Sequence, residues 1–298
     1  MKTIRGILLV LAALVLAACV AAPPPPTATP PPASVTPSAG LPLTVAFLDV
    51  GQGDATLIRS PGGRTMLIDG GNSSQDADQV IIPALQRWGS QRLDIMVATH
   101  PDQDHIGGLE RVIEVVPVGQ MVLTGQVHTT KTYEQLLTAI RDKKLAAVRA
   151  RAGTGLDLDP LLTAAVLGPT DEQVSSDDTN NASIVIRLSY RAVNFLFIGD
   201  AEEAEESTIL RSGADVHAQI LKLGHHGSRT STNQEWLQAV SPEVGMISVG
   251  ADNRYGHPQR ETLDLLTRDR IKVYRTDQQG TITVVSDGSG YQVTTEQR

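Results

Sequence analysis

The sequence contains very little cysteine, since Cys19 is the only one in 298 residues. Cys19 lies in the N-terminal leader, so the rest of the chain has no thiol for a disulfide or a thiolate metal site. The folded part must therefore be stabilised by its hydrophobic core, and a hydrophobic content of 41% is sufficient for one. Any metal site must be built from histidine, aspartate and glutamate.

Basic and aromatic residues are also scarce. Lysine and arginine number 25 against 33 acidic residues, the formal net charge is -8, and aromatic residues make up 3% of the chain. This charge excludes a basic protein that coats nucleic acid, and the low aromatic content argues against a stacking platform for single strands. Any contact with nucleic acid must be local, at a site where bound cations reverse the sign of the charge.

Long hydrophobic runs are missing too. The apolar run from Gly6 to Leu16 is short for a membrane span, and no long spans of a DNA channel follow it, so we expect no uptake pore in this chain. A positively charged start precedes the run and LAAC (16–19) ends it, which resembles a bacterial lipoprotein signal. The resemblance implies export, cleavage before Cys19 and a lipid anchor on the extracytoplasmic face of the cell membrane. The alternative is a membrane-anchor helix with an incidental cysteine.

Residues 20–40 are dominated by proline, alanine, threonine and serine and show no hydrophobic periodicity. Such a segment is expected to form a semi-rigid extended tether. The predicted organisation is therefore a signal peptide at 1–18, a lipidated cysteine with its tether at 19–40, and one enzyme-sized domain at 41–298.

From Leu41 onward, short β-like runs are interspersed with helical patterns. Strands are expected within 43–50, 55–60, 65–70, 93–100, 120–125, 161–169, 183–190, 193–200, 219–226, 243–250, 271–276 and 280–286. Helices are expected within 76–88, 109–116, 133–145, 202–211, 234–240 and 261–268. The early strands follow one another and the later ones alternate with helices. This order predicts a layered α/β domain in which sheets pack together and are covered by helices.

Four potential metal ligands lie together in ATHPDQDHIGG (98–108): His100, Asp102, Asp104 and His105. They follow a buried strand, at the end where open α/β sheets commonly place ligands. Pro101 prevents a helix from starting at once, and the two glycines allow a tight turn into the next helix. The four side chains are therefore expected in one stiff loop.

Two further strand ends carry potential ligands, Asp200 after FLFIG and His225-His226 after ILKLG. Convergence of three strand ends is what a two-metal site needs, because two divalent ions roughly 3.5 to 4 Å apart require several anchors and a shared carboxylate. Taken singly, each motif also fits a helix cap or a turn.

THPDQDHIGG (99–108) resembles the signature of the metallo-β-lactamase superfamily, and with Asp102 it resembles the branch attached to ComEC-type DNA-uptake competence proteins. FLDVGQGDA (47–55), LIDGG (67–71), LKLGHHGS (221–228) and YGHP (255–258) support this branch. The likeness extends from Leu43 to Val285 and implies a four-layer αβ/βα sandwich of two mixed sheets covered by helices, with metals at the edge between the sheets.

The resemblance implies two divalent metal ions, zinc or manganese, and a ligand for each. His100 and Asp102 would serve the first ion, Asp104 and His105 the second, Asp200 would bridge them and His225 would complete the second site. Asp104 also counts as a catalytic residue, together with His226 and His257 as candidate proton donors.

The chain departs from many relatives at two places. It has Asp102 where they have histidine, and DDTNNAS (177–183) contains no histidine before the strand that leads to Asp200. We expect that the first ion is weakly held, or that an asparagine oxygen or a water completes its site. This oxygen-richer set shifts the preference from zinc toward manganese without excluding zinc. His128 is expected in a turn.

The sequence does not decide the roles of three aspartates that lie beside glycines. Asp49, Asp54 and Asp69 can each orient a ligand histidine by a hydrogen bond or simply initiate a turn.

The sequence therefore predicts a lipid-anchored, metal-dependent hydrolase. The preferred reaction is hydrolysis of a phosphodiester in extracellular DNA or nucleotide esters, in which two cations activate a water. One alternative is hydrolysis of another ester or amide, such as a lactone or a β-lactam, although Asp102 argues against a β-lactamase. The other is a surface binding protein without turnover. The sequence leaves the oligomeric state open.

Overall fold

A computed structural model describes residues 41–297. The expected signal peptide, the lipidated Cys19 and the tether lie outside the described residues. Within 41–297, every helix is too short or too polar to cross a membrane.

The first of two sheets has eight strands in the order β15-β14-β1-β2-β3-β4-β5-β6. These strands are β1 (Leu43–Phe47), β2 (Thr56–Arg59), β3 (Thr65–Ile68), β4 (Leu93–Val97), β5 (Val118–Leu123), β6 (Ala146–Arg149), β14 (Ile282–Ser286) and β15 (Tyr291–Thr295). The strands from β15 to β3 pair antiparallel, and those from β3 to β6 pair parallel. The sheet is therefore mixed.

The second sheet has seven strands in the order β13-β12-β11-β10-β9-β8-β7. These strands are β7 (Gly155–Leu156), β8 (Thr163–Gly168), β9 (Val185–Tyr190), β10 (Val193–Phe197), β11 (Ile220–Lys222), β12 (Val244–Ile247) and β13 (Lys272–Arg275). β10, β11, β12 and β13 are parallel and the other pairs are antiparallel. Both sheets thus contain parallel strands whose carboxyl ends meet at one edge.

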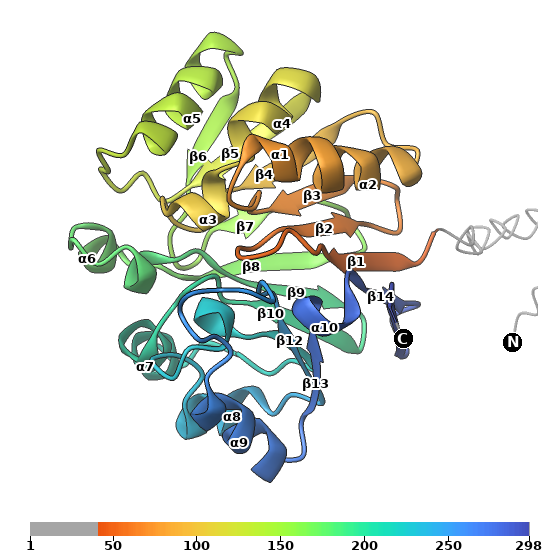
Figure 1. The fold of residues 1–298 in the computed structure, drawn as a ribbon, viewed down its shortest axis with the longest axis vertical. Coiled ribbons are helices and arrows are strands. Elements are labelled where there is room, and N and C mark those ends of the chain that lie inside the picture. The colour runs from red at the N-terminus through yellow and green to blue at the C-terminus, as the bar shows by residue number, and fades with distance from the viewer. Residues whose placement is uncertain (1–40, 298) are drawn as a thin grey trace, which may run out of the picture. The chain divides into compact units, whose positions relative to one another are not determined.

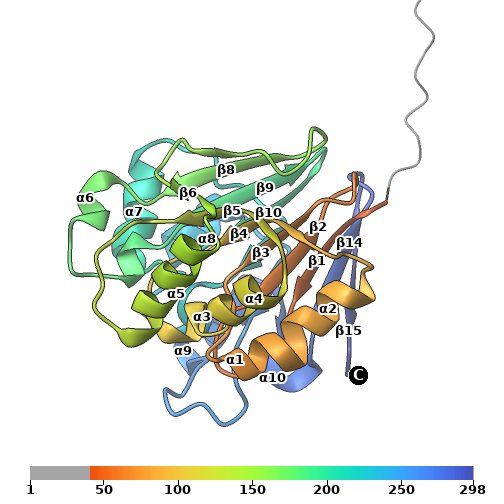
Figure 2. The ribbon, with the colours of Figure 1, turned by 90° about the horizontal axis from the view of Figure 1, so that it is seen from above.

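Helices cover the outer face of each sheet (Figures 1 and 2). Those that pack on the first sheet are the π-helical turn η1 (Ala77–Ile81), α2 (Ile82–Arg87), α4 (Leu109–Val115) and α5 (Lys131–Asp142). The short α1 (Ser74–Asp76), which buries no side chain, leads into η1. Those on the second sheet are α7 (Glu203–Arg211), α8 (Gln234–Val240) and α9 (Arg260–Arg268). The short elements are α3 (Gln103–Ile106), α6 (Asp171–Val174), α10 (Thr276–Gln279), and the 3-10 turns η2 (Asn180–Ala182) and η3 (Gly224–Gly227).

Three apolar clusters separate the four layers. One lies between the sheets and the other two lie between a sheet and its helices. Successive side chains of a strand point to opposite faces, so Val45 and Phe47 of β1 enter the cluster between the sheets whereas Ala46 and Leu48 enter the helix-facing one. Because both faces are buried, these strands are apolar runs without alternation. The predicted layered α/β architecture is confirmed.

Each run predicted as a strand contains one, and the differences lie at the ends and in exposed segments. The helix expected at 133–145 begins at Lys131, because the Thr130 side chain accepts a hydrogen bond from the Tyr133 N–H, and it ends at Asp142. α3 is a helical turn where a loop was expected. β6, β7 and β15 were missed because they are short or largely exposed and have no apolar run.

Candidate metal centre

Loops from both sheets bring the predicted ligands together. β4 leads to His100, and β3 beside it leads to Asp69. In the other sheet β10 leads to Asp200, and the parallel β11 leads to His225 and His226. The site therefore lies where the edges of the two sheets meet.

Two glycines allow the loops of the first sheet to approach one another closely. Gly53 has φ +141°, and a Cβ there would collide with the backbone oxygen of Asp104. The neighbouring Asp54 N–H donates to that same oxygen at 3.0 Å. A Cβ on Gly107 would likewise collide with the backbone of Asn72. These contacts explain Gly53 of the FLDVGQGDA motif and Gly107 of the HIGG motif, because only glycine leaves room for the opposite backbone.

Asp200 lies at the centre of the cluster and is 3% exposed. On one side, its Oδ2 is 4.0 Å from Nε2 of His100, and that Nε2 is 3.9 Å from Oδ2 of Asp102. On the other side, its Oδ1 is 3.2 Å from Nε2 of His105. Its two oxygens thus face two different histidines, as a bridging carboxylate would. The assignment of a first and a second ion to these groups remains a prediction.

The two consecutive histidines of η3 both point into the cluster. Nε2 of His225 is 3.8 Å from Oδ2 of Asp200, and Nε2 of His226 is 3.6 Å from it. His226 is also 3.2 Å from Oδ2 of Asp104. Both histidines have left-handed backbones, with φ 45° and 53°, a conformation that is costly for non-glycine residues and is enriched at functional sites. His226 is therefore a candidate ligand of equal standing to His225.

The unpaired atoms of this cluster fit a divalent cation. Within residues 41–297, Nε2 of His100, Nε2 of His105 and Oδ1 of Asp200 are buried without a hydrogen-bond partner. Buried polar atoms are normally paired, so these lone pairs are suited to a metal. One ligand atom each from Asp54, His105, Asp200 and His226 lies within 4.8 Å of the others. Imidazole and carboxylate donors suit both zinc and manganese.

Asp69 orients His105. Its Oδ2 is 2.8 Å from Nδ1 of His105 and accepts a hydrogen bond from the Thr99 hydroxyl, and its Oδ1 accepts one from the Thr99 N–H. Such a carboxylate fixes the tautomer that leaves Nε2 free for a metal. Asp49, by contrast, accepts only from the Gly51 N–H in a turn. The alternatives that the sequence left open are thus resolved differently for the two residues.

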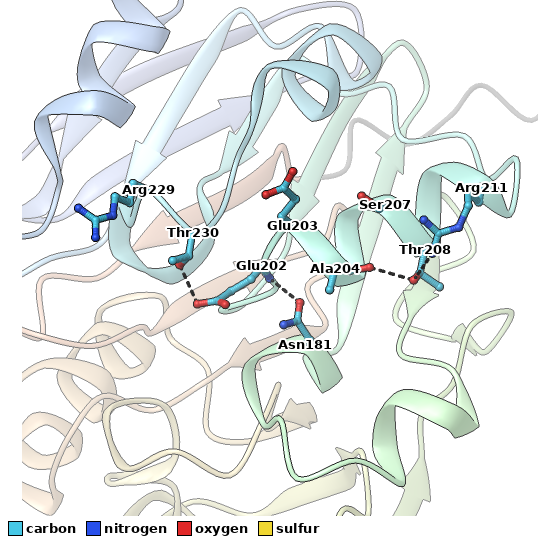
Figure 3. A pocket seen from close by; sticks show the side chains of 9 residues that line it. All are labelled: Asn181, Glu202, Glu203, Ala204, Ser207, Thr208, Arg211, Arg229 and Thr230. Carbon is cyan, nitrogen blue, oxygen red and sulfur yellow. Dashed lines mark hydrogen bonds between the residues drawn. The ribbon is translucent and has the colours of Figure 1, made fainter.

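Glu202 orients His225 as Asp69 orients His105. This role of Glu202 was not predicted from the sequence. Its Oε1 is 2.9 Å from Nδ1 of His225 and accepts a hydrogen bond from the Thr230 hydroxyl at 2.7 Å. Figure 3 shows this carboxylate between Thr230 and Asn181, whose side-chain oxygen accepts from the Glu202 N–H at 3.2 Å. Glu202 follows Asp200 by two residues at the same strand end, which is the signal that could have identified it.

The segment DDTNNAS (177–183), which contains no histidine, lies beside the ligands and contributes amide and hydroxyl groups. Nδ2 of Asn180 is 3.5 Å from Nδ1 of His225, and the Ser183 hydroxyl is 3.5 Å from Nδ1 of His100. Among the described residues, Oδ1 of Asn180 has no hydrogen-bond partner. The expected asparagine oxygen is therefore present beside the site, and its binding to the first ion remains a prediction. His128 lies in a loop away from the cluster, where it contacts Thr130.

A buried ion pair supports the other side of the site. Nζ of Lys222 is 2.7 Å from Oδ2 of Asp54, and the two side chains are 3% and 6% exposed. Oδ1 of Asp54 is in turn 3.3 Å from Nδ1 of His226, which contacts the backbone oxygen of Ser248 at 2.9 Å. The sequence analysis missed Lys222, although a charge inside the apolar run ILKLG is an observable signal.

The charges of the cluster are strongly coupled. Burial raises the pKa of Asp200, but the imidazoles of His105 and His226 lower it to well below its usual value. Burial lowers the pKa of His226, but Asp200 and Asp54 raise it to about 10. For His257, burial together with the neighbouring His225 and His226 lowers the pKa to about 4. The carboxylates thus attract positive charge, as a cation site must, and His257 is neutral at pH 7.

His257 stands at the rim of the cluster. Its ring lies 5.2 Å from that of His225 and 6.3 Å from that of His226. Within the described chain, its buried Nδ1 has no hydrogen-bond partner. The residues predicted for the site, which belong to segments far apart in the sequence, thus lie close together in the structure.

Comparison with known proteins gives a family and several relatives. The family model described as "Metallo-beta-lactamase superfamily" matches residues 48–251. The chain is 33% identical to ComE operon protein 3 of Bacillus subtilis (strain 168) over 253 residues, covering 80% of this chain and 32% of that protein. It is 32% identical to Competence protein ComA of Neisseria gonorrhoeae over 239 residues, covering 80% and 31%. It thus spans about a third of the length of these relatives.

A solved structure shows the same fold. CmlA, a diiron beta-hydroxylase from Streptomyces venezuelae, superposes with a TM-score of 0.53 at 15% sequence identity. The match covers 84% of this chain and 55% of CmlA. At this identity the likeness concerns the fold alone.

Proposed function

Because the chain belongs to the metallo-β-lactamase superfamily, whose members are generally hydrolases, we propose that it is a metal-dependent phosphodiesterase. Its substrate would be extracellular DNA or a nucleotide ester. The four-layer sandwich and the superfamily predicted from the sequence motifs are confirmed, whereas the reaction is our proposal.

The observation that carries the proposal is the cluster around Asp200. It offers histidine and carboxylate atoms on both sides of one buried carboxylate, which is the arrangement a two-metal hydrolase requires. The relatives named competence proteins support a nucleic-acid phosphodiester as the substrate. Both relatives are more than twice as long as this chain. DNA uptake itself therefore enters the proposal only as the process that this chain would accompany.

The side chains of the cluster would bind the metal ions. His100 and Asp102 would hold one ion, Asp104 and His105 the other, with Asp200 between them and His225 or His226 completing the set. Divalent cations there would activate a water and stabilise the charge that develops on the phosphate. Two of the ligand rings are held from behind, His105 by Asp69 and His225 by Glu202, so their Nε2 atoms face the site before metal arrives.

His257 would act on the substrate rather than on the metal. Its ring lies at the rim and is neutral at pH 7, so it can donate an N–H hydrogen bond to a phosphate oxygen or to the leaving oxygen. His226 is the second candidate for this role. His257→Ala should leave metal content unchanged and lower the rate by roughly 10²- to 10³-fold, as is typical when one hydrogen-bond donor to the developing negative charge is lost.

The location that fits this substrate is outside the cytoplasm. We propose that Cys19 carries a lipid that anchors the domain to the outer surface of the cell membrane, with residues 20–40 as the tether. The membrane and DNA would then be its two partners.

The test compares metals and substrates in one panel. The full chain, loaded with manganese or with zinc, is given single-stranded DNA, double-stranded DNA, a chromogenic phosphodiester, a lactone and a β-lactam. Hydrolysis of phosphodiesters alone supports the proposal. Hydrolysis of the lactone or the β-lactam instead would assign another ester or amide, and a metal-free protein without turnover would assign a binding protein. Asp200→Asn is the control for contaminating nucleases.

A further inference from the structure

Tyr255 is unusual among the aromatic residues of this chain. All ten of them, two tryptophans, five tyrosines and three phenylalanines, lie within residues 41–297. In that part of the chain, Tyr255 is the only one that is classed as exposed, with 51% of its surface accessible. A single exposed aromatic ring is not unusual on a protein surface, but such a ring also offers a flat face on which a base can stack.

The ring of Tyr255 lies beside the metal centre. Its plane is inclined by 25° to that of His257, with the ring centroids 5.8 Å apart. Tyr255 and Asp104 line the same cleft of about 490 Å³, a volume within the range of small-ligand sites. A group bound against Tyr255 would therefore be next to a group bound at Asp104.

The loop that carries Tyr255, between β12 and α9, is held in shape. The side-chain amide of Asn253 donates to the backbone oxygens of Gly250 and His257, and its oxygen accepts from the His257 N–H at 2.9 Å. The backbone N–H of Gly250 donates in turn to Gln52 across the cleft. The ring is thus presented on a closed, hydrogen-bonded loop, so little ordering would be needed on binding.

The remaining lining of the cleft suits a neutral, planar, polar group. Three amides, those of Gln52, Asn72 and Gln103, line it and can both donate and accept hydrogen bonds. Its charged residues are the acids Asp104 and Asp252 and one cation, Arg254. A phosphate gains little from such a lining, whereas a nucleobase can stack on the ring and pair with the amides.

Arg254 completes this arrangement. Its guanidinium lies 5.2 Å from the centre of the Tyr255 ring and donates to the tyrosine hydroxyl at 3.1 Å. Arg254 is exposed, so its side chain can leave the ring for a phosphate of the bound strand. That movement would open a face of the ring to a base and supply one local positive charge in an acidic protein.

We propose that Tyr255 and the amides around it form a nucleobase subsite, which holds the base next to the phosphodiester at the metal centre. The inference rests on the proposed phosphodiesterase function and narrows its substrate to nucleic acid with an unpaired base. The scarcity of aromatic residues argued against a stacking platform for a long strand, and a single ring is consistent with that expectation.

Binding of two short single strands tests the subsite. Both carry the same fluorophore and phosphorothioate linkages that slow hydrolysis, but one contains thymine bases and the other abasic sugars. Stacking on one aromatic ring is worth roughly 5- to 150-fold in affinity. Wild-type, manganese-loaded protein should bind the thymine strand more tightly by a factor in this range. Tyr255→Phe should keep this preference and Tyr255→Leu, of similar apolar size without a ring, should abolish it.

The outcomes separate the subsite from the reaction. Equal binding of the two strands by wild type, or an unchanged preference in Tyr255→Leu, would overturn the subsite. Hydrolysis of the thymine strand and of the abasic strand, both with ordinary phosphodiester linkages, is measured beside binding and reports the reaction. Base preference without any hydrolysis would leave the subsite standing and refute the phosphodiesterase, and hydrolysis without base preference would do the reverse.

Discussion

Asp69 shows how a single residue prepares a ligand. One carboxylate oxygen contacts Nδ1 of His105 at 2.8 Å while both oxygens accept hydrogen bonds from Thr99, the residue before His100. Asp69 is 1% exposed, so these contacts do not compete with water. It therefore positions the loop and the ring together without binding the metal.

Asp69→Asn should weaken metal binding by roughly 10- to 100-fold, as is typical when the partner of a ligand histidine is lost. Asp49→Asn is the matched control, because Asp49 also follows a strand but accepts only from a turn N–H. The measurement is metal retained by each variant after dialysis against chelators of increasing strength. Equal retention by the two variants would mean that Asp69 has no orienting role.

Lys222 and Asp54 form a buried pair whose two charges depend on one another. Lys222→Met should lower the free energy of unfolding by roughly 3 to 5 kcal/mol, because it leaves the Asp54 carboxylate buried and without its cation. Adding Asp54→Asn should recover part of the loss by removing the orphaned charge. Denaturant unfolding measures both, with Lys143→Met, at an exposed position, as control. No loss in Lys222→Met would contradict the account.

The residues that gather in this cluster could be found in the sequence, but the roles of the residues behind the histidines could not be decided from it. His100, Asp102, Asp104 and His105 lie within six positions, and Asp200, His225 and His226 follow apolar strands, so each motif is visible locally. Asp69 meets His105 only through the pairing of β3 with β4, and Asp54 meets Lys222 across the two sheets. Such contacts follow from three-dimensional packing, which no local pattern specifies.

At the scale of elements, α7 supports the site from beneath. Glu205 and Glu206 in its first turn are both fully buried. Glu205 accepts a hydrogen bond from the backbone N–H of Ser183, whose hydroxyl accepts one from the N–H of Asp200. Glu206 accepts from the backbone N–H of Thr232 in the loop after η3. The helix thus fixes the segments on both sides of Asp200.

Glu206 makes the stability of this element dependent on pH. Burial raises its pKa to about 7, above the ordinary value of 4.5, so the folded state holds a proton that the unfolded state has released. Stability should therefore fall as pH rises from about 4.5 to about 7. Unfolding of Glu206→Gln across this range should show a shallower fall than the wild type. Glu134→Gln, at an exposed position on α5, should keep the wild-type slope, and identical slopes in all three proteins would refute the argument.

Strands were more predictable than helix ends. A strand buried on both faces, such as β1 or β10, is an apolar run that can be recognised without its neighbours. The exposed edge strand β6 has no such run, and its place is decided by pairing with β5. α3 was expected as part of a loop because Pro101 stands before it, yet the extended Asp102 occupies the N-cap and the helix begins directly after it.

At the scale of the whole molecule, the proposed lipid anchor on the N-terminal segment would decide where the domain acts. If Cys19 is lipidated, Cys19→Ser should abolish labelling by a fatty-acid analogue and should release the domain from membranes or leave an uncleaved precursor. Fractionation with an antibody to the domain measures this. An unlabelled wild type with an unchanged membrane fraction would contradict lipid anchoring.

The central claim is that the two sheets together form one two-metal site. His100 and His105 follow a strand of the first sheet, and Asp200 and His226 follow strands of the second. Metal content by plasma mass spectrometry, taken beside the rate of phosphodiester hydrolysis, tests it most directly. Asp200→Asn should lower both together, because it removes the charge shared by the two half-sites. Asp102→Ala should retain about one ion per chain instead of about two and lose nearly all turnover, since two-metal hydrolysis needs both ions. Full metal content and full activity in both variants would contradict the account.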